Sequence, residues 1–111
     1  MSEFFTVTVS QVTRRLSMLV KGDKALSDVY VAGEISNFTL HKASGHMYFT
    51  LKDETSSIKC VMFAGKAAGL TFMPYSGQSV IVHGGVNVYE RDGANQIYVN
   101  EIIEKGQGEL A

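Results

Sequence analysis

The side chains in this sequence that could act on a ligand are aromatic rings and cations, and several stand at alternating positions. Tyr48 and Lys52 are four residues apart, so in an extended strand they project from the same face, and Lys59 follows in the next alternating segment. Aromatic rings offer platforms on which unpaired bases stack, and cations on the same face contact the phosphates of a single strand. Neither residue type requires a ligand, because tyrosine is a good strand former and lysine is common on solvated strands. The pattern therefore points to nucleic acid only if the fold gathers more such residues.

Residues suited to hydrolysis or metal binding are not spaced to work together. Ser44, His46 and Asp53 have the types of a catalytic triad, but one extended strand would hold His46 and Asp53 about 20 Å apart or more. No third ligand accompanies His41 and His46 at metal-ligand spacing. Cys60 falls in the inward phase of a strand, where a thiol behaves as a small hydrophobic group. We therefore expect no catalytic residue, no metal site and no cofactor in this chain.

Composition describes a folded domain of nearly balanced charge. The 111 residues are 45% hydrophobic and include one proline, which argues against disorder. Ten basic and eleven acidic side chains leave a net charge of −1, so any nucleic-acid binding must rest on local positive charge and be sensitive to salt. A single cysteine, no signal-peptide pattern and no apolar run of about 20 residues predict a cytoplasmic domain.

A helix is expected at the start of the domain. Thr8 and Gln11 have the spacing of a capping box with Thr8 as N-cap, and Val7 and Val12 occupy the positions of a hydrophobic staple. Residues at helical spacing then form one apolar stripe, namely Val12, Leu16, Leu19 and Val20. The opposite face carries the cations Arg14, Arg15 and Lys21. Gly22 is the expected C-terminal stop.

After this helix the hydrophobic period changes to two, which predicts strands. The expected strands span residues 29–38, 46–53, 58–63, 79–89 and 96–103, with a short helix within residues 64–72. Gly84 and Gly85 interrupt the fourth strand, where we expect a bulge or sharp bend. Three strands, a short helix and a two-strand hairpin follow the order of the OB-fold, a mainly β, five-stranded Greek-key barrel. The competing SH3-like barrel usually lacks a helix between its third and fourth strands.

OB-folds usually bind nucleic acid on the outer face of strands two and three, flanked by the loops between strands one and two and strands four and five. This face and its loops offer cations and aromatics, which are Phe38, His41, Lys42, His46, Tyr48, Lys52, Lys59, Tyr89 and Arg91. Phe38 has an alternative role, which is to cap the end of the barrel. The set is more informative than any member, because such residues gather where this fold usually binds.

Ordered motifs along the chain resemble the exodeoxyribonuclease VII large subunit. They are Val9–Gln11, Val31–Asn37, Ser44–Asp53, Ile58–Phe63 and Val86–Tyr89. The resemblance runs from about Thr6 to Leu110, and the ordered set is more specific than any single motif. It implies the N-terminal OB-fold domain of that subunit, with residues 1–28 as helix and lead-in, residues 29–104 as the barrel and residues 105–111 as the start of a linker to a catalytic region.

The resemblance also implies a function. The family's enzyme degrades single-stranded DNA from both ends to oligonucleotides in the bacterial cytoplasm, and its large subunit assembles with small subunits. The OB-fold domain would hold the strand, while the catalytic motifs would lie downstream and leave this chain without hydrolytic activity. Combined with the face described above, the resemblance assigns the grip to Phe38, Lys42, His46, Tyr48, Lys52, Lys59 and Arg91. Acidic residues at Glu34, Glu90 and Asp92 dilute the charge there, which predicts weak binding by one copy and added affinity from several copies or from the catalytic region.

Two other functions remain open from the sequence. An anticodon-type OB domain reads RNA with an aromatic residue on strand two and a polar residue on strand three, and Tyr48 and Lys59 fit that pattern in kind. A protein-docking OB domain would use the same face for subunit assembly, with Tyr48 as an interface anchor. The near-neutral charge favours the docking alternative.

Overall fold

A computed structural model describes residues 5–105, and in it helix α1 (Val9–Lys21) begins at the cap that the sequence predicts. The Gln11 N–H donates to Thr8 Oγ1 at 3.1 Å, and the Thr8 N–H donates to Gln11 Oε1 at 2.7 Å, so the capping box is confirmed. The helix ends at Gly22 as expected, with a right-handed backbone at φ −80°. A one-turn helix that the sequence did not predict, α2 (Lys24–Ser27), then leads into the barrel. Within residues 5–105, no helix is long and apolar enough to cross a membrane.

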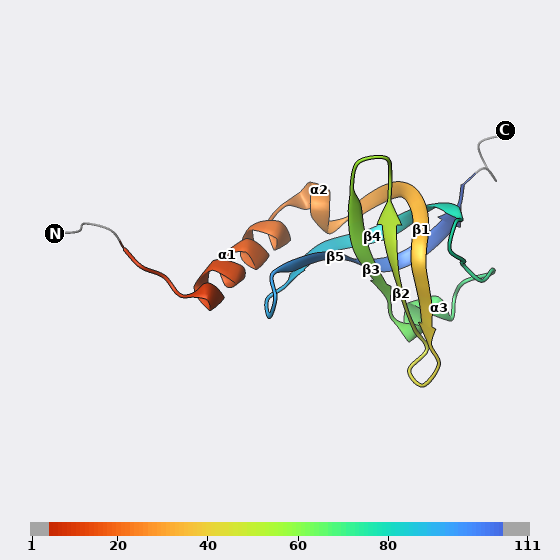
Figure 1. Ribbon diagram of the computed structural model, residues 1–111, viewed down its shortest axis with the longest axis horizontal. Helices are drawn as coiled ribbons and strands as arrows, with labels where there is room; N and C mark the ends of the chain where they lie inside the picture. Colours follow the sequence, from red (N-terminus) through yellow and green to blue (C-terminus); the bar gives the residue numbers. More distant parts are fainter. Residues whose placement is uncertain (1–4, 106–111) are drawn as a thin grey trace.

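Five strands close into a barrel in the order β1-β2-β3-β5-β4, which confirms the predicted OB-fold (Figure 1). The strands are β1 (Val29–His41), β2 (His46–Lys52), β3 (Ser57–Met62), β4 (Ser79–Tyr89) and β5 (Ala94–Glu104). Only the pairing of β3 with β5 is parallel among the strand pairs described. Helix α3 (Ala64–Ala67) lies between β3 and β4 as predicted, but it is a single turn, because the glycines in this segment disfavour a longer helix.

Two irregularities bend the long strands around the barrel. The predicted bend at the glycine pair of β4 is confirmed, because the β4–β5 register shifts between His83 and Gly84. A Cβ at Gly84 would lie 2.1 Å from the carbonyl oxygen of Tyr98, so only glycine fits there. The second irregularity was not predicted: the β1–β2 register shifts after Ser36, where Asn37 takes a left-handed backbone with φ 54°. Asparagine tolerates this conformation better than most residues do.

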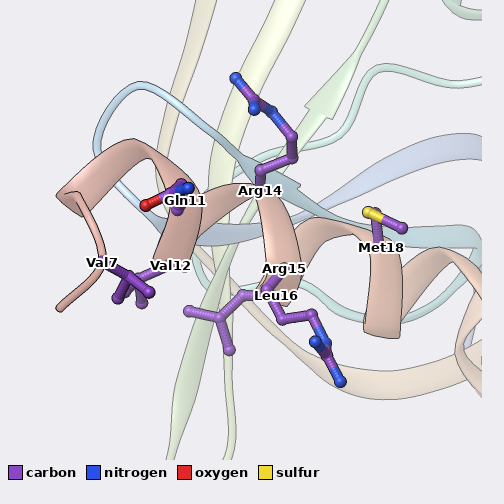
Figure 2. Close-up of a pocket in the computed structure, with 7 residues that line it drawn as sticks. All are labelled: Val7, Gln11, Val12, Arg14, Arg15, Leu16 and Met18. Carbon is purple, nitrogen blue, oxygen red and sulfur yellow. The ribbon is translucent and has the colours of Figure 1, made fainter. Parts of the chain in front are cut away.

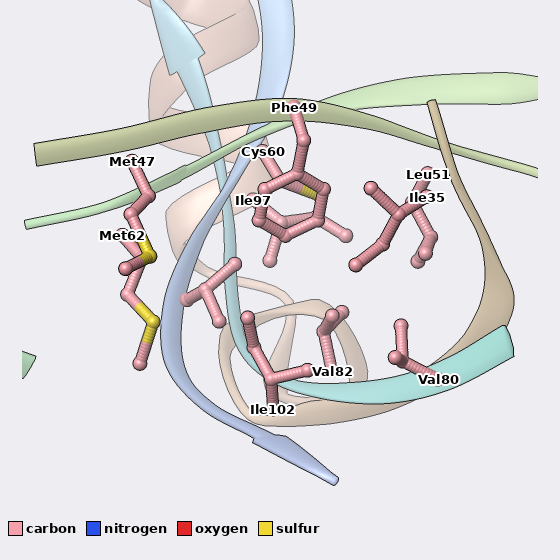
Figure 3. Close-up of a cluster of buried hydrophobic side chains, with 11 residues drawn as sticks. Ile35, Met47, Phe49, Leu51, Cys60, Met62, Val80, Val82, Ile97 and Ile102 are labelled. Atoms are coloured by element: carbon pink, nitrogen blue, oxygen red, sulfur yellow. The ribbon is translucent and has the colours of Figure 1, made fainter. Parts of the chain in front are cut away.

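The inward side chains of all five strands form one core, shown in Figure 3. Its buried members are Ile35, Met47, Phe49, Leu51, Cys60, Met62, Val80, Val82, Ile97, Val99 and Ile102. The predicted inward phases of the second and third strands are confirmed by Phe49, Leu51, Cys60 and Met62. Burial raises the pKa of the Cys60 thiol to about 12, so it stays protonated and acts as a core hydrophobe.

Helix α1 packs on the barrel through small side chains and leaves its apolar stripe outside. Ser17 is 1% exposed and is the only buried residue of the helix, which lies beside β4. Leu16 and Leu19, by contrast, are 45% and 59% exposed. The molecule measures 65 × 35 × 23 Å, and Figure 1 shows α1 extending beyond one end of the barrel. The stripe predicted from the sequence therefore exists but does not contribute to the core.

A charged cluster around His83 fastens the segment before β1 to the barrel. His83 Nε2 lies 2.5 Å from Asp28 Oδ1, and His83 Nδ1 lies 3.0 Å from Glu101 Oε1. The Tyr30 ring stacks on the imidazole with centroids 4.2 Å apart and an interplanar angle of 8°. The hydrogen bond to Asp28, with further help from Glu101, raises the pKa of His83 above its usual value. A protonated His83 therefore donates to one carboxylate on each side.

Candidate nucleic-acid interface

Four aromatic rings form a continuous cluster over the outer faces of β2, β3 and β5. The His46 ring meets Tyr48 edge-on at 6.5 Å and Phe63 edge-on at 5.1 Å between centroids. Phe63 in turn meets Tyr98 at 5.6 Å with an interplanar angle of 74°. Tyr48 and Phe63 are each 43% exposed, so their surfaces are open to a ligand. Exposed aromatic surface on an OB-fold face is suited to stacking on unpaired bases.

Neighbouring elements hold these rings in place. The N–H of Ala64, the first residue of α3, donates to His46 Nδ1 at 2.9 Å. Nδ1 accepts this bond, and the short helix thereby orients the ring against Phe63. In the strand register Val61 stands opposite both Tyr48 and Tyr98, and it is only 5% exposed although it belongs to the outward phase. The two tyrosines thus cover Val61 from both sides.

Phe63 and Tyr98 were not among the site residues predicted from the sequence. Tyr98 lies on β5, and only the parallel pairing of β3 with β5 brings it to the face that holds Tyr48. The alternation of Ile97 and Val99 with Tyr98 was a usable signal, because inward neighbours place Tyr98 on the outer face. Phe63 directly follows β3, whereas the predicted third strand includes it as its last residue.

A shallow hollow of about 280 Å³ lies next to Tyr48, with Phe49 and Cys60 and several polar side chains in its lining. Asn37, Thr50, Lys59 and Gln96 line it together with Tyr48. Lys59 stands opposite Thr50 on β2 and Gln96 on β5, and its side chain is exposed. Amide groups can form hydrogen bonds with base edges, while the Lys59 ammonium can contact a phosphate. The hollow thus combines groups that can bind the bases and the phosphates of a single strand.

The loops at the two ends of this face carry two of the predicted cations. Exposed Lys42 lies in the β1–β2 turn, which directly precedes His46. Ser44 shapes this turn, because its Oγ accepts from the His46 N–H at 3.1 Å and lies 2.8 Å from His41 Nδ1. Exposed Arg91 lies in the β4–β5 turn, just before residues 94 and 95, which line a second hollow beside Lys59. The turns therefore flank the aromatic cluster and Lys59 from opposite ends.

Two predicted residues lie in different surroundings. Phe38 packs against the core with its ring 6.4 Å from Phe49, which is the barrel-capping alternative. Lys52 is exposed on the same face as Tyr48 but near the far end of β2, about 20 Å from His46 by strand rise. It stands opposite Glu34 in the register and shares a hollow with three acids, Glu34, Asp53 and Glu54, and one further cation, Lys105.

The electrostatics of the face are therefore uneven. Within residues 5–105, the side chains that line the two hollows beside Lys59 include no acid. At the Lys52 end, Asp53 accepts from the N–H groups of Thr55 and Ser56 at 2.9 Å, and these bonds lower its pKa and keep it charged. Positive charge is least diluted around Lys59, beside the aromatic cluster.

Comparison with known families agrees with this architecture. A family model described as "OB-fold nucleic acid binding domain" matches residues 7–103. The chain belongs to this family. The OB-fold nucleic acid binding domain seen here is also 51% identical over 105 residues to the exodeoxyribonuclease 7 large subunit of Natranaerobius thermophilus, a match that covers 95% of this chain and 25% of that protein. The resemblance predicted from the sequence is confirmed, and the chain spans about a quarter of the length of the curated relatives it matches.

Solved structures support the fold of this OB-fold domain. The second OB-fold domain of replication protein A from Methanococcus maripaludis aligns with a TM-score of 0.57 and 19% identity, over 75% of this chain and 88% of that one. The asparaginyl-tRNA synthetase from Pyrococcus horikoshii aligns with a TM-score of 0.52 and 23% identity, over 72% of this chain and 20% of that one. At these identities the likeness shows the fold alone and does not choose between DNA and RNA.

Proposed function

We propose that this OB-fold domain binds single-stranded DNA across the outer faces of β2, β3 and β5 and, within a longer polypeptide, positions the strand for exonucleolytic degradation to oligonucleotides. The observation that carries the proposal is the continuous aromatic cluster beside Lys59. Lys59 lines a hollow whose described lining includes no acid. The name of the curated relatives supports DNA as the ligand.

In this proposal Tyr48, Phe63 and Tyr98 stack on bases, and Lys59 contacts a phosphate between them. Lys42 and Arg91 extend the path at the two flanking turns, and His46 orients the rings. Stacking on one aromatic residue contributes about 1–3 kcal/mol per base. With few cations on the face, one copy binds weakly and several copies gain by avidity.

The proposal also includes a partner, a cellular location and a separate catalytic region, all taken from the resemblance to the exodeoxyribonuclease VII large subunit. The exodeoxyribonuclease VII small subunit is the protein partner of the longer polypeptide, the bacterial cytoplasm is the location, and the catalytic residues lie outside this chain. The division into a helical lead-in at residues 1–28, a barrel at 29–104 and a linker from 105 onward fits β1 and β5, which begin at Val29 and end at Glu104.

Fluorescence anisotropy with a labelled oligo-dT of about 20 nucleotides tests the proposal, with wild type beside Tyr48→Ala and Tyr98→Ala. Each substitution should weaken binding by about 5- to 150-fold, which corresponds to a stacking loss of about 1–3 kcal/mol. Tyr75→Ala is the matched control, because Tyr75 is an exposed tyrosine outside this face. Equal losses in Tyr48→Ala and Tyr75→Ala would contradict the assignment of the face.

The same titration separates the rival functions. Competition by unlabelled duplex should be weak, because paired bases cannot stack on the rings. Clear preference for one transfer RNA over oligo-dT would select the anticodon-type alternative. If oligo-dT does not bind at high micromolar protein, DNA binding by this chain is overturned. Subunit docking would then be the function of this face.

A further inference from the structure

Helix α1 presents an apolar surface that no element covers in the described part of the chain. Val12, Leu16 and Leu19 are all exposed, although their spacing makes them one stripe. Figure 2 shows Val7, Val12 and Leu16 on one side of the helix, with Arg15 beside Leu16 and Arg14 pointing away. Arg15 therefore borders the apolar stripe, whereas the sequence predicted it on the opposite face. These residues line a hollow of about 470 Å³ that is larger than either hollow beside Lys59. We call Val7, Val12, Arg15, Leu16 and Leu19 the α1 face.

The barrel cannot cover this face without turning the helix. At 100° per residue, Leu16 lies about 100° and Leu19 about 160° around the helix from Ser17, the residue buried against the barrel. A side chain built on Gly93 would meet Thr13 Cγ2 at 3.7 Å, so the β4–β5 turn also lies beside the Thr13–Ser17 side. Contiguous exposed apolar side chains of this kind mark interaction sites. The fold thus holds the α1 face outward.

Charge identifies the partner. The sequence of α1 contains Arg14, Arg15 and Lys21 and no acidic residue. A second copy packed on the same face would bring Arg15 towards its own equivalent, and like charges at an interface oppose association. A membrane surface is disfavoured because the chain has a net charge of −1, which opposes attraction to anionic lipids. A protein segment with apolar residues between acids complements both the apolar stripe and the positive charge of α1.

We propose that the α1 face docks an acidic amphipathic helix from a separate polypeptide chain. Its apolar stripe packs on Val12, Leu16 and Leu19, and its acids pair with Arg15 at the edge. The 13 residues of α1 span about 20 Å, which suits a partner helix of three to four turns. β5 ends at the end of the barrel opposite to α1 (Figure 1), so a segment that directly follows β5 would have to cross the barrel to reach the α1 face. This inference does not depend on DNA binding.

The test uses the whole 111-residue chain and two labelled synthetic helices of about 18 residues. Both have leucines at a/d spacing, flanked by glutamates in one peptide and by lysines in the other. The acidic peptide should bind, and the basic peptide should bind at least about tenfold more weakly. Leu16→Ser/Leu19→Ser should weaken acidic-peptide binding about tenfold or more while leaving oligo-dT binding unchanged. Met73→Ser is the matched control, because Met73 is an exposed apolar residue outside α1.

A charge swap makes the test specific. Arg15→Glu should weaken the acidic peptide and strengthen the basic one, which a merely structural role would not do. Equal binding of the two peptides, or unchanged binding in Leu16→Ser/Leu19→Ser, would overturn the proposal. Two other results would also overturn it. The first is co-sedimentation of the chain with phosphatidylserine–phosphatidylcholine vesicles, if Leu16→Ser/Leu19→Ser abolishes it. The second is a dimer of the chain in sedimentation equilibrium, if the same variant dissociates it.

Discussion

Replacement of Lys59 by glutamine should change the salt dependence of single-strand binding more than replacement of Lys52 does. Each cation that contacts a phosphate of a single strand adds about 0.7 to the slope of log K against log salt. Lys59 lies in a hollow whose described lining includes no acid, whereas Lys52 stands opposite Glu34 and near Asp53. We therefore count Lys59, and not Lys52, among the phosphate contacts, although both are exposed lysines on the same barrel face.

The magnitude follows from the residues that flank the aromatic cluster. Contacts from Lys59, Lys42 and Arg91 give a slope of about −2.1, and Lys59→Gln reduces it to about −1.4. Between 50 and 200 mM salt the wild-type affinity should therefore fall about 18-fold, and that of Lys59→Gln about 7-fold. Lys52→Gln should keep the wild-type slope.

Anisotropy titrations with oligo-dT at four sodium chloride concentrations measure these slopes. Lys52→Gln serves as the matched control, because it removes the same charge from the same face. Circular dichroism and the urea midpoint establish that both variants keep the fold. An unchanged slope in Lys59→Gln, or an equal reduction in both variants, would refute the assignment of Lys59 as the phosphate contact.

Three further predictions concern the fold. Gly84→Ala should lower the free energy of unfolding by at least about 2 kcal/mol in urea denaturation, because its Cβ would meet the Tyr98 carbonyl, while Gly65→Ala, which has open space, should not destabilise. The raised pKa of His83 means that its ion pairs stabilise the fold fully below the unfolded pKa of about 6.5 and lose that effect as pH rises through the folded pKa. The urea midpoint of wild type should therefore exceed that of His83→Gln more at pH 6 than at pH 8.5, and a difference that grows with pH would count against the cluster. Because the pKa of Cys60 is about 12, iodoacetamide at pH 8 should modify the native thiol about a hundredfold or more slowly than the unfolded one, as mass spectrometry can follow.

The barrel was predictable because its signals are local. The alternation that places Phe49, Cys60 and Met62 inward has a period of two within each strand, so it can be found without knowing the strand's neighbours. The bend at Gly84 was equally visible, since paired glycines inside a strand usually mark a bulge or a close approach of two backbones. The bulge at Asn37 was not, because asparagine is also common in turns and loops.

The site was predictable only in part. Tyr48 and Lys59 could be placed on one face from strand phase and the usual OB-fold binding surface. Phe38 is in a sequence position that suits either the loop or the barrel end, and only the packing against Phe49 distinguishes the two. Tyr98 joined the cluster through the β3–β5 pairing, which joins segments far apart in the chain.

The sequence by itself determined the elements of this protein: the Thr8 cap, the strand phases and the order of strands and short helix typical of an OB-fold. Tertiary structure decided which of these elements meet. It placed Phe63 beside His46 and Tyr98 beside Phe63, separated Lys52 from the least acidic part of the face, and turned Ser17 rather than Leu16 towards the barrel. The physical reason is that the periodicity of side chains along a helix or strand is a property of each segment. Burial, by contrast, depends on how closely two surfaces can approach, and a serine allows closer approach than a leucine.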